Sequence, residues 1–394
     1  MFYLIGKSLK HSLSEQIHHK LSPINYRCLE LDSLDEFFLR KDFAGLNVTI
    51  PYKEEVMKYL DSIDDKAKQI GAVNTVINSN GLLTGYNTDY DGFIGLLQRN
   101  EVNIKDKRVL VLGTGGSSKT VKQVCLDLSA QSISFCSRTN GENVFTYKEV
   151  EGLDFEIVIN TTPNGMSPNN DDGLLLDINK FDSLETVIDL IYNPLSTKLL
   201  LSADINVKTI NGLYMLVHQA YVAHKLFINR DISIKVVEAI YRNLLFENMN
   251  IVLIGMPMSG KSTYGKRISK RFNKQFIDSD DEIVKLEGKT IPELFEIGEN
   301  HFRKVESKVI NSFSRDHNQV IACGGGVIKN KKNIDSLRQH GIIIFLDKPL
   351  EELQKIDSLD RPLIKNKKSI LDLYEERIDL YKKYSDYTLI DYKL

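Results

Sequence analysis

The stretch GMPMSGKS at residues 255–262 has the residue types and spacing of a loop that binds a nucleoside triphosphate. It fits G-x-x-x-x-G-K-[ST], in which backbone N–H groups surround phosphate oxygens, the lysine reaches the outer phosphates and the hydroxyl binds Mg²⁺. The loop follows the apolar run IVLI at 251–254 and precedes a helical pattern, which is the context that such a loop requires. We therefore predict that ATP or GTP binds here.

Two carboxylates follow that loop at the end of a predicted strand. Asp278 and Asp280 alternate in FIDSDDEI (276–283), so both can lie near bound phosphates. Acidic residues at such positions are equally often helix N-caps, and this stretch alone leaves both interpretations open.

A second glycine turn, GTGGSS (113–118), follows the apolar run VLVL (109–112). It is similar to the dinucleotide fingerprint G-x-G-x-x-G, with Ser118 in place of the third glycine. Arg138 follows the next predicted strand, where an acidic residue would indicate NAD and an arginine favours the 2′-phosphate of NADP. An ordinary glycine turn and an exposed loop arginine are the alternatives.

Two short polar stretches in the first half of the chain carry Lys53 and Asp89. Lys53 follows a proline-broken strand in AGLNVTIPYKEEV (44–56), and Asp89 lies in GYNTDYDGF (85–93). Taken singly, a lone lysine is usually a solvated surface group, and an Asn-Thr-Asp cluster is usually a turn or a helix cap.

The elements that must position these residues are strands separated by helices. Apolar runs without alternation, each followed by an amphipathic stretch, indicate parallel sheets covered by helices, so we predict an α/β protein. The runs are VLVLG (109–113), SISFC (132–136), FEIVIN (155–160), TVIDLI (186–191), IVLIG (251–255), VIACG (320–324) and IIIFL (342–346).

The length of 394 residues exceeds what one hydrophobic core usually serves, so two or three folding units are expected. From about 211 to 246 the pattern is purely helical, and a new strand opens at Ile251 almost without a linker. We place the main boundary there. A softer boundary falls near residue 105, before the strand that begins at Val109.

The composition is that of an ordinary globular protein that acts on small molecules. Hydrophobic residues make up 42% and charged residues 26%, and the formal charge of -2 argues against a nucleic-acid or acidic-membrane partner. We see neither a signal-peptide pattern nor a run near the ~20 apolar residues of a membrane span, so we expect a cytoplasmic protein. The four cysteines (Cys28, Cys125, Cys136 and Cys323) stand far apart and predict buried reduced thiols, not a zinc site or disulfides.

Residues 250–394 resemble shikimate kinase. Six motifs occur in that family's order, namely the phosphate loop, FIDSDDEI, GKTIPELFEIGENHFRKVE (288–306), CGGGV (323–327), DRPLI (360–364) and EERIDLY (375–381). The resemblance implies a P-loop domain with a parallel sheet that binds ATP and Mg²⁺ and phosphorylates shikimate. The family commonly has an arginine near the adenine where this chain has Gln354.

This resemblance implies roles for individual residues. Asp280 would hold the shikimate hydroxyls and activate the attacking one, and Arg361 would close on a lid and neutralise charge during transfer. Arg303 and Arg377 would grip the substrate carboxylate as charge-assisted forks. The backbone would approach the substrate at Gly324, Gly325 and Gly326. ATP would be held by Gly255, Ser259, Gly260, Lys261, Ser262 and Thr263, and Mg²⁺ by Ser262 and Asp278.

Residues 1–247 resemble shikimate dehydrogenase. The resemblance implies an α/β substrate domain over 1–105, completed by helices at 211–247, and a Rossmann-like NADP domain over 106–210, with the kinase domain at 250–394. The family usually has proline where this chain has Ser8 and Glu15. The motifs are HSLS (11–14), NVTIPYK (47–53), GAVNTV (71–76), NTD (87–89), GTGG (113–116), SRT (137–139), NTTPNGM (160–166), DLIYNP (189–194) and NGLYMLVHQA (211–220).

Here too the resemblance implies roles. Lys53 and Asp89 would form the acid–base pair at the carbon that is reduced. The substrate carboxylate would be bound by Ser12, Ser14 and Tyr192, and the ring hydroxyls by Thr49, Asn74, Asp89 and Gln219. NADP(H) would be held by Gly113, Gly115, Gly116, Ser137, Arg138, Thr139 and Gly212.

Together the two resemblances imply a fusion that performs two consecutive reactions of the shikimate pathway, which leads to chorismate and the aromatic amino acids. NADPH would reduce 3-dehydroshikimate to shikimate, and ATP would phosphorylate its 3-hydroxyl. The alternatives are a quinate/shikimate dehydrogenase fused to another small-molecule P-loop kinase, and a substrate-binding regulator in place of the dehydrogenase. The sequence does not indicate an oligomeric state.

Overall fold

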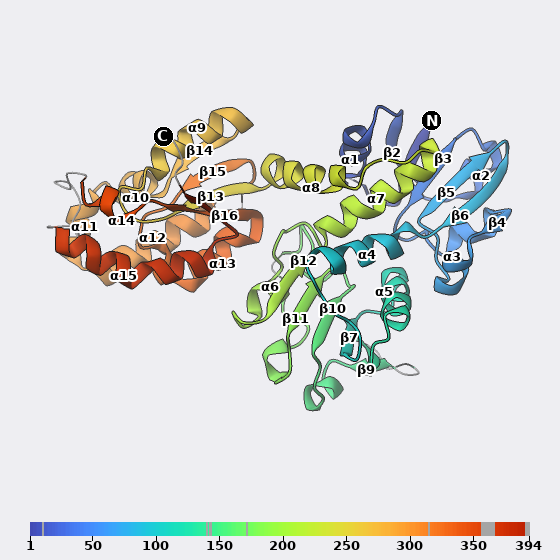
Figure 1. The fold of residues 1–394 in the computed structure, drawn as a ribbon, viewed down its shortest axis with the longest axis horizontal. Coiled ribbons are helices and arrows are strands. Elements are labelled where there is room, and N and C mark those ends of the chain that lie inside the picture. The colour runs from blue at the N-terminus through green and yellow to red at the C-terminus, as the bar shows by residue number, and fades with distance from the viewer. Residues whose placement is uncertain are drawn as a thin grey trace. The chain divides into compact units, whose positions relative to one another are not determined.

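The computed structural model describes residues 1–9, 12–138, 141, 144–170, 172–313, 316–355 and 367–390. Its contacts divide the chain into two compact units, Met1–Arg242 and Asn243–Leu394. Figure 1 shows three sheets covered by helices, two in the first unit and one in the second. The predicted α/β class is confirmed.

The first sheet of the first unit is mixed, with strand order β2-β1-β3-β5-β6-β4. The β3–β5 and β5–β6 pairs are antiparallel, and none of the apolar runs that predicted parallel strands lies in this sheet. Asn80 and Gly81 have φ of 55° and 89° and close the β5–β6 hairpin. The strands are β1 (Phe2–Gly6), β2 (Tyr26–Glu30), β3 (Gly45–Val48), β4 (Ser62–Ile63), β5 (Thr75–Ser79) and β6 (Leu82–Tyr86).

The second sheet is wholly parallel, with order β12-β11-β10-β7-β8-β9. The order reverses between β7 and β10, and ligands of such open sheets bind at this switch point beyond the carboxyl ends of the strands. The strands are β7 (Arg108–Leu112), β8 (Ser132–Ser137), β9 (Val144–Thr146), β10 (Ile157–Asn160), β11 (Thr186–Asp189) and β12 (Lys208–Asn211).

Alternation along β7 builds a core on each face of this sheet. Val109 and Val111 pack with side chains of α4, α5 and α7, whereas Leu110 and Leu112 pack with α6. Figure 1 shows α4 and α7 between the two sheets of the unit, where they pack on each other. The helices are α1 (Ser14–Leu21), α2 (Asp35–Arg40), α3 (Asp65–Ile70), α4 (Thr88–Arg99), α5 (Gly116–Asp127), α6 (Lys198–Ser202) and α7 (Leu213–Ile228), with 3-10 turns at Glu55–Tyr59, Glu149–Gly152 and Ile178–Lys180.

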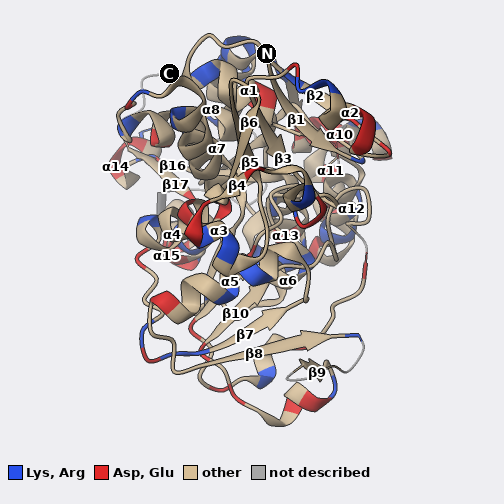
Figure 2. Ribbon diagram, turned by 90° about the vertical axis from the view of Figure 1, so that its right-hand side faces the viewer, with Lys and Arg blue, Asp and Glu red and all other residues tan. Residues whose placement is uncertain are grey.

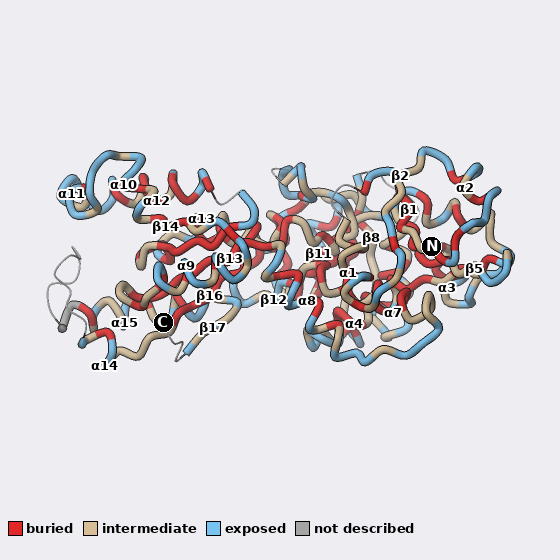
Figure 3. The backbone as a smooth tube through the Cα atoms, turned by 90° about the horizontal axis from the view of Figure 1, so that it is seen from above, coloured by how far each residue is buried: buried red, intermediate tan, exposed pale blue. Residues whose placement is uncertain are grey.

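The second unit is built on a parallel sheet of order β14-β15-β13-β16-β17. Its central strands are buried, and the outer faces of its helices are exposed (Figure 3). The strands are β13 (Asn250–Ile254), β14 (Gln275–Asp278), β15 (Gln319–Ala322), β16 (Gly341–Asp347) and β17 (Tyr387–Ile390). The helices are α9 (Lys261–Phe272), α10 (Ser279–Glu287), α11 (Ile291–Ile297), α12 (Glu299–Phe313), α13 (Lys331–His340), α14 (Leu350–Leu353) and α15 (Lys367–Tyr384), with a 3-10 turn at Val327–Lys329.

Helix α8 (Lys235–Asn248) begins in the first unit and ends in the second. Glu238 near its start pairs with Arg99, and Phe246 near its end stacks on Phe272. The domain limits expected near 105, 210 and 250 stay predictions.

All seven predicted apolar runs contain strands. Lys and Arg are interspersed with Asp and Glu along the helices and loops (Figure 2). Within the described part of the chain, no helix combines the length and apolar character that crossing a membrane requires.

Candidate functional site

The predicted acid–base pair of the first unit is in direct contact. Lys53 lies in the turn after β3, and Asp89 lies in the first turn of α4, which Asn87 caps by accepting a hydrogen bond from Tyr90 N at 3.2 Å. Lys53 Nζ donates to Asp89 Oδ2 at 2.6 Å. The two side chains are only 15% and 11% exposed, so the pair is largely shielded from water.

Two of the predicted hydroxyl-binding residues come together beside this pair. Asn74 Nδ2 donates to Gln219 Oε1 at 3.5 Å, and Asn74 Oδ1 accepts from the backbone N–H of Thr88 at 2.7 Å. Gln219 on α7 reaches the site because α4 carries Gly92 opposite it, where a Cβ would lie 2.8 Å from the Gln219 Cβ. Thr49 lies just after β3 and packs on Gly6.

Two of the three predicted carboxylate-binding residues interact with Cys28, which the sequence motifs do not include. The Ser14 N–H donates to Ser12 Oγ at 3.2 Å. Burial raises the pKa of the Cys28 thiol, Glu15 raises it further, and a hydrogen bond with Ser12 opposes both. Burial, and then the charge of Cys28, raises the pKa of Tyr192. Ser12, Tyr192 and Glu15 therefore all lie close to one half-buried thiol.

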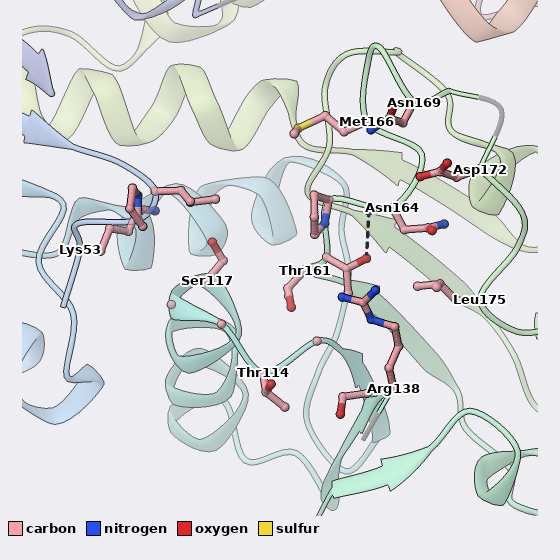
Figure 4. Close-up of a pocket in the computed structure, with 18 of the residues that line it drawn as sticks. Lys53, Thr114, Ser117, Arg138, Thr161, Asn164, Met166, Asn169, Asp172 and Leu175 are labelled. Atoms are coloured by element: carbon pink, nitrogen blue, oxygen red, sulfur yellow. Dashed lines mark hydrogen bonds between the residues drawn. The ribbon is translucent and has the colours of Figure 1, made fainter. Parts of the chain in front are cut away.

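A cavity of about 650 Å³ opens beside Lys53, between the carboxyl ends of the strands of the second sheet and the turn after β3. Figure 4 shows Lys53 and Ser117 at one side and Arg138, Thr161 and Asn164 at the other. The predicted cofactor residues on its wall are Gly113, Gly115, Gly116, Ser137 and Arg138.

The cavity fits a dinucleotide. Gly115 is the N-cap of α5, so the start of that helix presents backbone N–H groups suited to a pyrophosphate. Gly113 has a φ of 102°, and a Cβ there would lie 2.9 Å from Thr161 Oγ1, so a side chain would be strained and crowded. Ser118, in the third glycine position, is buried and donates to Gly115 O at 2.6 Å.

Gly212 and Thr139 are the two remaining predicted cofactor residues of the first unit. Gly212 is not among the residues that line the cavity, and a Cβ on it would clash with the backbone oxygen of Leu190. Close packing therefore accounts for this glycine, and its role toward the cofactor stays a prediction. Thr139 lies outside the described residues.

Asp189, at the end of β11, was not singled out from the sequence but supports the cavity wall. It is fully buried and accepts from Thr197 Oγ1 at 2.6 Å and from Asn160 Nδ2 at 3.0 Å. Asn160 Oδ1 in turn accepts from Thr162 Oγ1 at 2.7 Å, which orients the lining segment that follows β10. Burial raises the pKa of Asp189 to about 7.

In the second unit, the phosphate loop joins β13 to α9. Gly255, Met258 and Gly260 have φ of 150°, 66° and 84°, so the chain curls around the space before the helix start. Lys261 Nζ donates to the backbone oxygens of Gly255 and Met256 at 3.0 and 2.8 Å. Ser259, Ser262 and Thr263 complete the predicted loop. A turn with such φ values can direct successive N–H groups toward one anion, which fits the predicted triphosphate.

The predicted metal ligands are adjacent. Ser262 Oγ donates to Asp278 Oδ2 at 2.5 Å, and Asp278 Oδ1 also caps α10 by accepting from Asp280 N at 3.1 Å. The N-cap interpretation of Asp278 is therefore confirmed, and its role toward a metal ion stays a prediction. A hydroxyl and a carboxylate beside a phosphate loop fit Mg²⁺, which takes few protein ligands and keeps waters and phosphate oxygens.

The predicted substrate residues of the second unit surround Glu306, which the sequence motifs did not single out for a role. Glu306 is 1% exposed, and Arg303 Nη1 donates to its Oε2 at 2.9 Å. Burial raises the pKa of Glu306, Arg303 and Arg377 oppose this, and Asp280 adds to it. Its spacing of three residues from Arg303 on one helix was the available signal.

The three glycines after β15 leave room for these side chains. A Cβ on Gly324 would lie 2.6 Å from Asp280 Oδ1, and a Cβ on Gly326 would overlap the Arg303 guanidinium. Gly325 O accepts from Arg377 Nη1 at 3.2 Å and from the Tyr381 hydroxyl. Arg361 and its proposed lid lie outside the described residues.

Comparisons with known proteins match the first and second units to two different families. Residues 4–76 match the shikimate dehydrogenase substrate binding domain, and residues 257–393 match shikimate kinase. Shikimate dehydrogenase (NADP(+)) from Clostridium beijerinckii is 40% identical over 270 aligned positions, which cover 63% of this chain and 98% of that protein.

Two solved structures show the same relationship. A chorismate mutase/shikimate 5-dehydrogenase fusion protein from Clostridium acetobutylicum is 37% identical with a TM-score of 0.58, and the match covers 62% of this chain and 96% of that one. A quinate dehydrogenase from Corynebacterium glutamicum in complex with NAD is 27% identical with a TM-score of 0.55, and the match covers 62% and 98%. The chain therefore belongs to the shikimate dehydrogenase family through its first unit, and its second unit contains a shikimate kinase domain.

Proposed function

We propose that this chain reduces 3-dehydroshikimate to shikimate in its first unit and phosphorylates shikimate in its second. The observation that carries the first activity is the contact of 2.6 Å between Lys53 and Asp89 at the wall of the dinucleotide cavity. Arg138 on the far wall supports NADP(H) as the cofactor.

NADPH, when bound, supplies the hydride that adds to the ketone carbon. Lys53 donates a proton to the ketone oxygen as the carbon–hydrogen bond forms, so no free alkoxide is released. Asp89 accepts the hydrogen bond that orients the ammonium group, and a proton from water restores Lys53 after turnover. Asn74 and Gln219 bind ring hydroxyls, and Ser12, Ser14 and Tyr192 bind the carboxylate.

In the second unit ATP, when bound, supplies the γ-phosphoryl group. Asp280 accepts the proton of the attacking hydroxyl, and Lys261 stabilises charge on the outer phosphates. Ser262 and Asp278 hold Mg²⁺. Arg303 binds the substrate carboxylate while Glu306 and Glu299 keep its guanidinium oriented, with bonds of 2.9 and 3.2 Å.

Purified protein tests both activities at once. We expect NADPH oxidation with 3-dehydroshikimate and ADP release with shikimate. Lys53→Ala should remove the first activity and spare the second, and Lys261→Ala should do the reverse. Failure of either parent activity, with the other present, would overturn that half of the proposal.

Quinate with NAD is the second substrate pair to assay, because a quinate dehydrogenase shares the fold at a TM-score of 0.55. Arg138 favours NADP, so we expect shikimate with NADP⁺ to give the higher kcat/KM. The proposal also includes a cytoplasmic location, which the four free cysteines suit.

A further inference from the structure

Two histidines lie against each other in the interior of the first unit. His18 on α1 and His224 on α7 are both fully buried, and their Nδ1 atoms are 3.0 Å apart. His18 also stacks on Tyr26 with ring centroids 4.1 Å apart. Neither histidine lines the cofactor cavity, and the mechanism above uses neither.

Asn47, which is 5% exposed, sets the direction of the hydrogen bonds. Its side chain lies 3.4 Å from the carbonyl oxygen of Asn74, and because a carbonyl only accepts, the amide nitrogen must face that side. The Asn47 Oδ1 then accepts from the Tyr26 hydroxyl at 2.8 Å and from His18 Nε2 at 3.0 Å. His18 therefore carries a proton on Nε2.

The proton on His18 Nε2 determines which atoms donate and which accept in the neighbouring hydrogen bonds. Burial lowers the pKa of His18 to about 3 and that of His224 to about 4, so both rings are neutral at neutral pH. Neutral His18 accepts at Nδ1, so the proton between the rings belongs to His224 Nδ1. His224 Nε2 then accepts from the Ser22 hydroxyl at 2.6 Å.

From Asn47 the hydrogen-bond network continues into the proposed substrate site. Asn47 Nδ2 donates to Thr75 Oγ1 at 3.0 Å, and Thr75 Oγ1 donates to Asn74 Oδ1 at 3.1 Å. With its oxygen occupied in this way, Asn74 directs Nδ2 toward Thr88 Oγ1 at 3.1 Å and Gln219 Oε1 at 3.5 Å. These two amides are the proposed hydroxyl ligands.

The network ties together the elements that carry the proposed substrate residues. Each element contributes one network residue within five positions of one substrate residue. The pairs are His18 and Ser14 on α1, Asn47 and Thr49 at β3, Thr75 and Asn74 at β5, Thr88 and Asp89 on α4, and His224 and Gln219 on α7.

We propose that His18 and His224 are positioning residues for the dehydrogenase site. Both histidines are neutral and each is held in one tautomer, so they fix the orientation of the Asn47 amide. Through Thr75, Asn47 in turn fixes the Asn74 and Gln219 amides in the orientation that binds the ring hydroxyls. This inference rests on the proposed dehydrogenase function.

The kinetic test is His18→Phe in the full chain. The ring stack on Tyr26 is kept while the donor is lost, so we expect KM for 3-dehydroshikimate to rise about tenfold and kcat to change less than about threefold. His18→Gln keeps an N–H near the Nε2 position and should restore KM to within about threefold of the parent. His19→Phe, the same change at the exposed neighbour, should leave KM unchanged.

A spectroscopic test reads the tautomers in the parent chain itself and uses variants only to assign the signals. The parent chain is labelled with ¹⁵N-histidine, and tautomers of its 8 histidines are read from the ring nitrogen shifts. We expect His224 to be protonated on Nδ1 and His18 on Nε2 at pH 7, with assignments from His224→Gln and His18→Gln. This measurement decides the network even if His18→Phe does not fold.

The outcomes separate this inference from the proposed function. An inactive parent dehydrogenase would overturn the function, whereas an active parent whose His18→Phe variant keeps the parent KM would overturn only the positioning role. If His18→Phe raises KM and lowers kcat by the same factor, and His18→Gln restores neither, the role of His18 is merely structural. A charged or Nε2-protonated His224 would overturn the network itself. Kinase activity and NADP⁺ affinity of each variant report on folding.

Discussion

At the residue scale, Lys53 links the proposed acid–base pair to the cavity proposed for the cofactor. Its Nζ contacts Asp89 at 2.6 Å, and its side chain lies 3.9 Å from where a Cβ on Gly116 would stand, at the start of α5. The proposed proton donor therefore lies at the wall of the cavity that we propose for NADPH.

Lys53→Ala should lower dehydrogenase kcat by about 10²- to 10⁴-fold, because the alkoxide loses its general acid. KM for 3-dehydroshikimate should change little, since other side chains hold the ring. Steady-state NADPH oxidation measures both constants, and the kinase activity of the same sample is the control. Unchanged turnover would remove Lys53 from the mechanism.

Arg138→Leu should raise KM for NADPH by about 10- to 100-fold, as expected for loss of charge-assisted hydrogen bonds to a phosphate. KM for NADH, which lacks the 2′-phosphate, should stay near its parent value. Equal effects on the two cofactors would argue that Arg138 does not contact the 2′-phosphate.

The role of a residue could be predicted where the residue lies in a sequence motif. It could not be predicted where the residue only holds a motif residue in place. Lys53, Arg138 and Lys261 stand in motifs that indicate their chemistry. Glu306 and Cys28 do not, because a buried glutamate and a lone cysteine have no meaning until the fold brings a guanidinium or a hydroxyl beside them.

At the element scale, the contact between α4 and α7 brings Gln219 to the catalytic pair. Gly92 on α4 makes this approach possible, since a Cβ there would lie 2.8 Å from Gln219 Cβ and 2.9 Å from Met215 O. The backbone oxygen cannot move without shifting α7.

Gly92→Ala should therefore raise KM for 3-dehydroshikimate and lower the free energy of unfolding of the first unit by about 1–3 kcal/mol, the usual cost of overpacking. Denaturant unfolding and NADPH oxidation measure the two effects. Gly81→Ala is a matched comparison, because a Cβ there meets no atom and any cost comes from its φ of 89° alone, with no expected change in KM.

The central strands of the second and third sheets could be predicted from the sequence because buried parallel strands appear as continuous apolar runs, whereas the more exposed edge strands β9, β12 and β17 were not predicted. The first sheet could not be read in the same way, since β5 and β6 are half-exposed and antiparallel. The signal that was present is Asn80-Gly81, whose positive φ values suit a two-residue hairpin turn.

At the scale of the whole molecule, two units in one chain should respond separately to ligands and to pH. NADP⁺ should raise the midpoint of one calorimetric transition, and ADP with shikimate the other. This assigns each transition to a unit.

Asp189→Asn should show the pH dependence that its burial creates in the first unit. The folded pKa is raised to about 7 from 3.8, so the carboxyl contributes stability that is complete below about pH 4 and is lost as the pH rises through 7. We expect the advantage of the parent over the variant to shrink by a few kcal/mol from pH 4 to pH 8. The transition of the second unit is the internal reference, and a constant difference would contradict the prediction.

The sequence by itself determined the two glycine loops, the motif that carries Lys53 and the α/β class, because each depends on residues that are neighbours along the chain. Only the tertiary structure decided which side chains meet across elements: Lys53 with Asp89, Asn74 with Gln219, and His18 with His224. Such contacts join residues 36, 145 and 206 positions apart, and their geometry follows from how helices pack on sheets, which local spacing does not encode.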